Sequence, residues 1–236
     1  MVAAVVVRLG ERGLGEWRSR GWTLVRGFLG EERLAPLRRE CERLERQPFL
    51  FDQRGAVPAS RRRTDRLDPV IDVSPEFRAL AADPDLLALF GEAIGGEVRL
   101  LKDKYIAKPP GSDGYGLHVD GAYWLGLDLD LDRFATAVIF LDDATAGKGP
   151  VECADGWHRL APADEPIADP DEASVGAVSV VEARAGDMLL VHARTPHRSG
   201  PNRSAEPRRA LLFSYGVDAR PDLYQRYQHH RRGMTE

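Results

Sequence analysis

The chain has 236 residues, of which 43% are hydrophobic and 30% are charged, and its formal net charge is −4. These proportions are ordinary for a globular protein that buries a core, and a single β-barrel or β-sandwich domain often reaches this length. The small negative charge gives no reason to expect nucleic acid or an anionic membrane as a partner. No apolar run approaches the roughly 18 residues of a membrane-spanning helix, so we expect no membrane span.

Cysteine usage and the first residues indicate the cellular compartment. Cys41 and Cys153 are the two cysteines of the chain, too few for a disulfide framework. The apolar residues 1–7 are too few for the core of a signal peptide, and Arg8 follows them rather than preceding them. We therefore expect a cytoplasmic protein.

The first third of the chain has the hydrophobic spacing of amphipathic helices. Within residues 31–46, four apolar side chains fall three, four and three positions apart, so they share one face of a helix. They are Leu34, Leu37, Cys41 and Leu44. Ser74 and Asp83 are each followed by proline, and this pairing of an N-cap residue with a first helical residue marks two more helix starts. We expect the second of these helices over 84–94, because Gly95 provides a C-cap.

After Gly96 the sequence changes to short runs rich in β-branched, aromatic or aliphatic residues. The runs cover residues 98–108, 134–141, 178–183, 188–192 and 210–215. Clusters of glycine, proline and aspartate separate them, as in turns. Helices followed by many short strands indicate a mostly β fold, with helices packed against an antiparallel sandwich or barrel. No shift in composition marks a boundary, so we expect one domain over 1–236, mainly helical at 1–96 with its β core at 97–217.

His118, Asp120 and His197 are the strongest chemical signal in the sequence. Residues at positions i and i+2 of a strand point to the same face, so His118 and Asp120 can face one cavity. His197 follows the predicted strand 188–192 and can join them from a neighbouring strand. Two imidazoles and one carboxylate form the ligand set of a non-haem Fe(II) site, in which three positions stay open. A His-x-Asp motif alone also occurs by chance, and His192 competes as the distal ligand.

Arg208 adds a group that the metal ligands lack. After His197 the chain has Gly-Pro-Asn at 200–202, which predicts a turn, and Arg208 then enters the next strand. That return places the arginine beside the metal. A guanidinium group offers a rigid fork for the far carboxylate of a 2-oxo-acid cosubstrate. Arg209 is the alternative, but strand alternation puts it on the opposite face.

In the order of these motifs the chain resembles the phytanoyl-CoA dioxygenase-like (PhyH) family of Fe(II)- and 2-oxoglutarate-dependent oxygenases. The family pattern is H-x-D, then Gly-Asp before a strand, then H-x-S-x-x-N-x-S-x-x-x-R. This chain matches the pattern at 118–120, 186–187 and 197–208. A Lys-Pro-Pro-Gly turn at 108–111 and the opening segment 21–29 are also similar, so the resemblance covers essentially the whole chain.

Two positions depart from the family pattern. Val119 stands where glutamine is common, and residues 154–158 stand where a Pro-Gly-Ser-His turn is common. Neither departure replaces a predicted ligand. Within the second segment we interpret His158 as a structural histidine rather than a fourth ligand.

The resemblance implies the fold and the main site residues. The implied fold is a double-stranded β-helix core (jelly-roll, cupin-like) with flanking α-helices. The implied iron ligands are His118, Asp120 and His197. Arg208 is then the partner of the 2-oxoglutarate C5 carboxylate, with Ser199 as its hydrogen-bonding neighbour.

Three further positions have less direct roles. Lys104 stands where family members have a residue that contacts the cosubstrate. The alternative for Lys104 is a solvated strand lysine next to Lys102. Asp187 and Asn202 are interpreted as residues that hold turns and support the site.

The cofactors that the resemblance implies are Fe(II), 2-oxoglutarate and O2. The expected reaction converts 2-oxoglutarate to succinate and CO2 and oxidises an unactivated C–H bond. Hydroxylation is the default outcome, while family members in secondary metabolism also desaturate, epimerise and close rings. Asp120 disfavours halogenation, because iron halogenases have a small residue in place of the carboxylate. We expect a compact small molecule as substrate, and the sequence leaves its identity and the oligomeric state open.

Two other functions and one alternative for a loop stay open. A cupin-like metal-dependent isomerase or dioxygenase would not use 2-oxoglutarate, and Arg208 argues against it. A non-catalytic binding protein on the same scaffold would not need an intact triad. Residues 53–67 are polar and basic, with three consecutive arginines at 61–63, and are expected to form a solvated loop. The alternative is that this loop covers the active site and meets an anionic group of the substrate.

Overall fold

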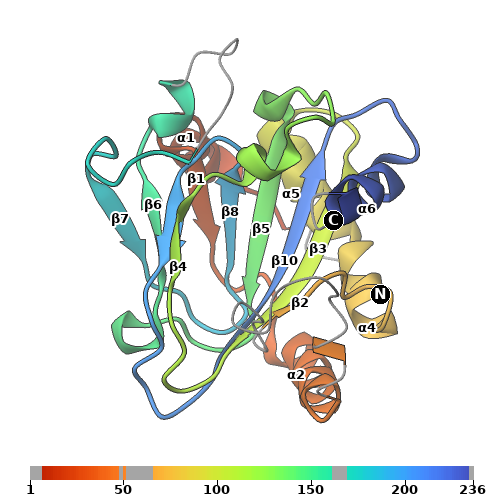
Figure 1. The fold of residues 1–236 in the computed structure, drawn as a ribbon, viewed down its shortest axis with the longest axis vertical. Helices are drawn as coiled ribbons and strands as arrows, with labels where there is room; N and C mark the ends of the chain where they lie inside the picture. Colours follow the sequence, from red (N-terminus) through yellow and green to blue (C-terminus); the bar gives the residue numbers. More distant parts are fainter. Residues whose placement is uncertain (1–6, 48–49, 52–65, 161–168, 234–236) are drawn as a thin grey trace.

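Two antiparallel β-sheets dominate the structure, a computed structural model that describes residues 7–47, 50–51, 66–160 and 169–233. The larger sheet has the strand order β1 (Trp22–Val25), β8 (Met188–His192), β5 (Phe134–Phe140), β10 (Arg208–Gly216), β3 (Arg99–Lys108) and β2 (Arg66–Leu67). The smaller sheet has the order β4 (Tyr115–His118), β9 (His197–Ser199), β6 (Val151–Ala154) and β7 (Val178–Val181). Figure 1 shows the two sheets side by side, with the smaller sheet on the left.

Apolar side chains from both sheets form a shared interior. Strands β5 and β8 contribute Val138 and Leu189, and strands β6 and β7 contribute Cys153 and Val181, all buried in one cluster. Sheets that bury their inner faces against each other form a sandwich. The architecture is therefore the antiparallel sandwich that the sequence predicts and the jelly-roll fold that the resemblance implies, mostly β with flanking helices.

Helices cover the outer face of the larger sheet. They are α1 (Gly10–Arg20), α2 (Glu31–Glu45), α4 (Pro75–Ala81) and α5 (Pro84–Ile94), whereas α6 (Leu223–Gly233) packs in a separate cluster with Leu101, Val119 and Trp124. Tyr105 of β3 and Phe213 of β10 pack in one cluster with Leu44, Phe77 and Leu86 from three of these helices. In the described part of the chain no helix has the length and apolar character needed to cross a membrane.

Side-chain caps begin two of these helices at the predicted residues. The Ser74 hydroxyl accepts a hydrogen bond from the Phe77 amide, and the Asp83 carboxylate accepts from the amides of Asp85 and Leu86. Each cap satisfies amides that have no partner within the helix. The predicted bounds 84–94 of the second helix are confirmed.

The first 96 residues contribute strands as well as helices. Strand β1 pairs with β8, and strand β2 pairs with β3, so both extend the larger sheet. The polar C-terminal segment around His229 and His230 forms helix α6. The predicted loop at 53–67 lies outside the described residues up to position 65, and the single-domain division stays a prediction.

Candidate metal centre

The predicted triad comes together at the end of the smaller sheet. His118, Asp120 and His197 each offer one ligand atom, and these atoms all lie within 4.8 Å of one another. His118 ends β4 and His197 begins β9, and the two residues are direct partners in that ladder. Their ring centroids are 4.3 Å apart. Within the described ranges no other group of histidine, cysteine or acidic residues converges in this way.

Asp120 lies outside the strand that was predicted to hold it together with His118. Strand β4 ends at His118, and Asp120 is the first residue of a 3-10 helix that continues to Trp124. Between them Val119 keeps an extended conformation, with φ −120° and ψ 124°. An extended residue between two side chains places both on one side of the chain. The alternation argument therefore holds for this pair, but the strand itself stops two residues early.

The Asp120 carboxylate is buried and held by groups from the larger sheet. Thr136 Oγ1 donates to Asp120 Oδ2 at 2.6 Å, and Ser214 Oγ lies 2.8 Å from Thr136 Oγ1. Lys102 Nζ lies 3.5 Å from Asp120 Oδ1. Burial raises the pKa of Asp120, but the positive charges of Lys102, His197 and Lys104 outweigh it and hold the pKa well below its ordinary value. The carboxylate is therefore an anionic ligand at neutral pH.

Both imidazoles are oriented by backbone carbonyl groups. His118 Nδ1 lies 2.8 Å from the Gly116 oxygen, and His197 Nδ1 lies 3.0 Å from the Thr195 oxygen. A carbonyl only accepts, so Nδ1 carries the proton and Nε2 keeps its lone pair for a metal. Burial, followed by the neighbouring His197, lowers the pKa of His118 to about 3. The neutral ring is the form that binds a metal.

Arg208, Lys108 and Ser199 form a polar floor below the triad. Arg208 is 3% exposed and is the direct partner of Lys108 in the β10–β3 ladder. Lys108 Nζ lies 3.0 Å from Ser199 Oγ and also donates to the Gly200 oxygen. Ser199 follows His197 by two residues on β9, so both point to the same face, about 6.6 Å apart along the strand. That separation is comparable to the length of 2-oxoglutarate.

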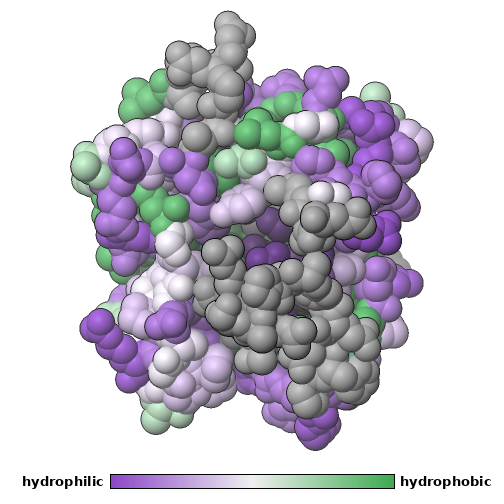
Figure 2. Space-filling view, viewed as in Figure 1, coloured by the Kyte–Doolittle hydropathy of each residue, from purple (hydrophilic) through white to green (hydrophobic). Residues whose placement is uncertain are grey.

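Lys108 belongs to the site, although its sequence context indicates only a Lys-Pro-Pro-Gly turn. Lys102, Lys104 and Lys108 occupy alternate positions of β3, which places all three on its inner face. The even spacing of these lysines in the sequence could have identified Lys108 as a residue of the inner face. Figure 2 shows strongly hydrophilic side chains, in dark purple, inside a hollow near the centre of the face that carries β4 and β10.

The rival residues lie away from the triad. Arg209 points to the other face of β10, where its Nε and Nη2 donate to Asp142 at 2.8 and 2.9 Å. His192 packs against His158, with ring centroids 5.1 Å apart, and against Trp17. In the described structure neither histidine belongs to the convergent group. The geometry therefore favours His197 and Arg208 over their competitors.

Lys104 and Arg66 lie on the inner face between the triad and the floor. Lys104 pairs with Leu212 of β10, and Arg66 pairs with Ile106 of β3. Lys104 is 8% exposed. Burial, followed by the charges of Lys102 and Arg66, lowers the pKa of Lys104 well below its ordinary value. The Arg66 guanidinium donates to Asp68 at 2.5 Å.

Asp187 and Asn202 hold turns, as predicted. The Asp187 carboxylate accepts from the amides of Gly27 and Arg184. The Asn202 amide donates to the Lys108 and Glu206 oxygens at 2.8 Å each. Asn202 thereby ties the end of β3 to the segment that leads into β10. It supports the polar floor without facing the triad.

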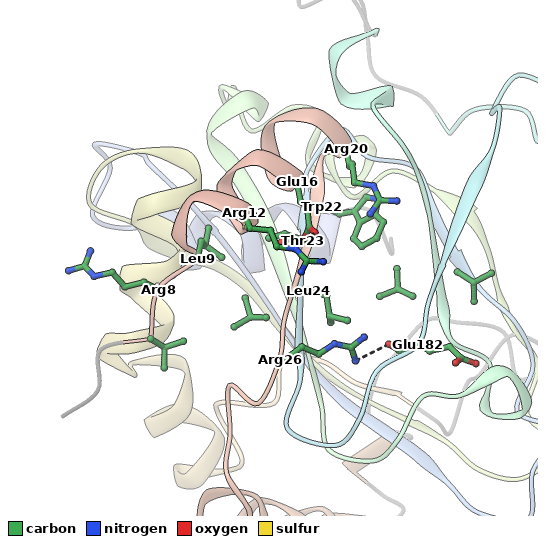
Figure 3. Close-up of a pocket in the computed structure, with 15 residues that line it drawn as sticks. Arg8, Leu9, Arg12, Glu16, Arg20, Trp22, Thr23, Leu24, Arg26 and Glu182 are labelled. Carbon is green, nitrogen blue, oxygen red and sulfur yellow. Dashed lines mark hydrogen bonds and ion pairs between the residues drawn. The ribbon is translucent and has the colours of Figure 1, made fainter. Parts of the chain in front are cut away.

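A second hollow lies on another side of the molecule. This groove has a volume of about 560 Å³ and is lined by residues of α1, β1 and β7. Figure 3 shows the residues that line it. Arg12, Arg20 and Arg26 line it, and Arg26 donates to the Glu182 backbone oxygen. No triad or floor residue lines the groove. The metal centre is therefore separate from it.

Comparisons with known proteins place this geometry in context. The family described as phytanoyl-CoA dioxygenase (PhyH) matches residues 17–210. A probable alpha-ketoglutarate-dependent hypophosphite dioxygenase of Stutzerimonas stutzeri is 25% identical over 88% of this chain and 79% of that protein. A methylphosphonate hydroxylase of Gimesia maris is 27% identical over 91% of this chain and 83% of that protein.

A solved structure supports the same relationship. The epimerase SnoN, in complex with Fe3+, alpha ketoglutarate and nogalamycin RO, superposes with a TM-score of 0.72 and 26% sequence identity. The match covers 87% of this chain and 82% of that chain. The likeness therefore extends over most of both chains.

Proposed function

The chain belongs to the phytanoyl-CoA dioxygenase (PhyH) family of Fe(II)- and 2-oxoglutarate-dependent dioxygenases, and we propose that it oxidises an unactivated C–H bond of a small molecule. The observation that carries the proposal is the convergence of His118, Asp120 and His197. Two Nε2 lone pairs and one ionised carboxylate fit an Fe(II) ion that keeps three positions open. Iron, 2-oxoglutarate and O2, when bound, supply the oxidising chemistry and release succinate and CO2.

The protein's own residues orient the reactants and exclude water. Thr136 and the backbone carbonyls behind the two histidines fix the three ligands before any metal binds. Preorganised ligands of this kind raise metal affinity and hold the open positions in a defined direction. Val119 and Trp124, close to Asp120 in the chain, are buried in an apolar cluster that limits water on that side of the site, which protects a reactive centre.

We assign the C5 carboxylate of 2-oxoglutarate to the polar floor. Arg208 and Lys108 supply two positive charges, and Ser199 supplies a hydroxyl donor. A bidentate contact to a guanidinium is a strong, directional way to hold a carboxylate. This paired floor favours a 2-oxoglutarate enzyme over a cupin-like isomerase or a binding protein on the same scaffold.

Hydroxylation is the proposed outcome, with desaturation, epimerisation and ring formation as alternatives. The SnoN relative is an epimerase from nogalamycin biosynthesis, which supports a place in secondary metabolism. The hypophosphite and methylphosphonate relatives support a compact substrate. We also propose a cytoplasmic location, where iron stays ferrous.

A succinate-release screen tests the proposal. The Fe(II)-loaded protein is incubated with 2-oxoglutarate, O2 and a panel of small metabolites that includes phosphonates, amino acids and aromatic polyketides. We expect succinate well above the uncoupled background with at least one compound. Failure to bind Fe(II) and 2-oxoglutarate at all would refute the proposal.

A further inference from the structure

Lysine is rare in this chain and concentrated at the site. Of 33 basic residues four are lysines, at positions 102, 104, 108 and 148. Three of these four lie on β3 and are at most 8% exposed. Lysine presents a compact point charge with three donors, whereas arginine presents a wide planar fork. A chain that otherwise uses arginine thus places compact ammonium groups where ligands must bind.

Two of the three strand lysines have partners within the protein. Lys102 faces Asp120, and Lys108 faces Ser199 and the Gly200 oxygen. Lys104 differs, because no hydrogen bond or ion pair joins it to any residue that the structure describes. A buried cation without a partner is costly. Burial and the like charges of Lys102 and Arg66 outweigh the attraction of Asp120 and Asp68 and lower the pKa of Lys104.

Arg66 adds a second incompletely used cation beside Lys104. Its direct partner on β3 is Ile106, two residues from Lys104, so both basic side chains rise from the same face. One end of the guanidinium donates to Asp68. The buried Nε has no hydrogen-bond partner among the described atoms. Two donors without an acceptor in the described structure, Lys104 Nζ of β3 and Arg66 Nε of β2, therefore lie on the same face of the sheet.

The carboxylates that already have a role in the site do not pair with both Lys104 and Arg66. Asp120 is committed to the metal, and Asp68 is shared between Arg66 and Arg231. One carboxylate of 2-oxoglutarate belongs to the metal and the other to the floor. None of these anions accepts a hydrogen bond from Lys104 Nζ or Arg66 Nε in the part of the chain that the structure describes.

We propose that the substrate carries a compact oxyanion group, a phosphonate or a carboxylate, which binds the Lys104 ammonium and the Arg66 Nε. This inference rests on the proposed function, because it assigns the substrate of that same site. It gives Lys104 to the substrate rather than to the cosubstrate. The substrate anion would enter with its reactive C–H bond directed at the metal.

Calorimetric titration tests the proposal without turnover. Protein loaded with redox-silent Mn(II) and saturating 2-oxoglutarate is titrated with methylphosphonate, with acetate and with uncharged dimethyl sulfone. We expect at least one anion to bind and the sulfone not to bind. Lys104→Met and Arg66→Met should each weaken anion binding about 10-fold or more, with the 2-oxoglutarate affinity changed less than 2-fold. The stronger of the two anions identifies the group.

Three outcomes overturn the proposal: no anion binds, the variants bind it as well as the wild type, or Lys104→Met weakens 2-oxoglutarate instead. If the protein binds neither Mn(II) nor 2-oxoglutarate, the proposed function fails rather than this inference alone. Lys148→Met is the matched control, because Lys148 pairs with Glu206 away from β3. It removes the same charge and should leave anion binding unchanged.

A melting experiment gives a second, independent result. Lys104→Met keeps the side-chain length and removes the unpartnered charge, so the ligand-free variant should melt about 2–4 °C above the wild type. A lower melting temperature would show that Lys104 has a stabilising partner within the protein, and the anion assignment would then be wrong.

Discussion

Thr136 of the larger sheet donates its hydroxyl hydrogen to Asp120 of the candidate metal centre, at 2.6 Å. The bond joins β5 of the larger sheet to the 3-10 helix that follows β4 of the smaller sheet. It fixes one carboxylate oxygen and leaves the other toward Lys102. The larger sheet therefore helps to orient the carboxylate ligand, while the two histidine ligands belong to the smaller sheet.

Thr136→Val should weaken metal binding by about 10- to 100-fold, which is usual when a supporting hydrogen bond to a ligand is lost. The valine fills the same space but cannot donate. Metal titration of the purified protein measures the effect. Thr136→Ser keeps the hydroxyl and should restore most of the affinity, and an equal loss in both variants would point to packing instead.

Asp120→Ala and His197→Ala should each abolish substrate-dependent succinate formation, because each removes one of three ligands. The fold should persist, since the two sheets bury a separate apolar cluster, and circular dichroism checks this. His229→Ala, at an exposed position of α6, is the control and should keep full activity. Undiminished turnover in either ligand variant would contradict the assignment.

Arg208→Ala should mainly raise the concentration of 2-oxoglutarate that the enzyme requires. The loss of a charge-assisted contact corresponds to about 10- to 100-fold in affinity. Binding of 2-oxoglutarate to the Mn(II)-loaded protein measures it. Arg209→Ala is a matched control, since that side chain pairs with Asp142 on the other face. A larger effect from Arg209→Ala than from Arg208→Ala would reverse the two roles.

Much of this arrangement could be predicted from local sequence signals. The apolar stripe of α2 and the caps at Ser74 and Asp83 act within a few residues, so spacing and residue type suffice to find them. The convergence of His118 with His197 was also predictable. The i, i+2 spacing predicts that His118 and Asp120 share one face, and the position of His197 after the strand 188–192, with the family order of motifs, predicts that His197 joins them.

Elements held mainly by distant partners escaped prediction. Strand β2 has two residues and exists through its pairing with β3. Helix α6 is largely polar, and it is anchored by Leu223, by Tyr227 and by the Tyr224 hydroxyl on Asp103. Such contacts leave no periodic signal. The partner of Lys108, Ser199, is likewise 91 residues away in sequence.

The buried cluster of Asp68 with Arg66 and Arg231 predicts how stability depends on pH. The Asp68 carboxylate is fully buried and accepts from both guanidinium groups at 2.5 Å. Burial raises the pKa of Asp68, but the charges of Arg66, Arg231 and Lys102 outweigh it and lower the pKa below its ordinary value of 3.8. A carboxyl whose pKa is lower in the folded state stabilises the protein fully above the unfolded value.

Asp68→Asn should therefore reduce the free energy of unfolding at pH 7 by about 3 kcal/mol, because two buried cations lose their counter-charge. Urea unfolding of both proteins from pH 7 to pH 3 measures the difference. The difference should stay constant down to about pH 5 and shrink below about pH 3.8, as the unfolded wild type takes up a proton that the folded protein resists. A difference that grows as the pH falls would mean that Asp68 is protonated in the folded protein, and the charge balance beside Lys104 would have to be revised.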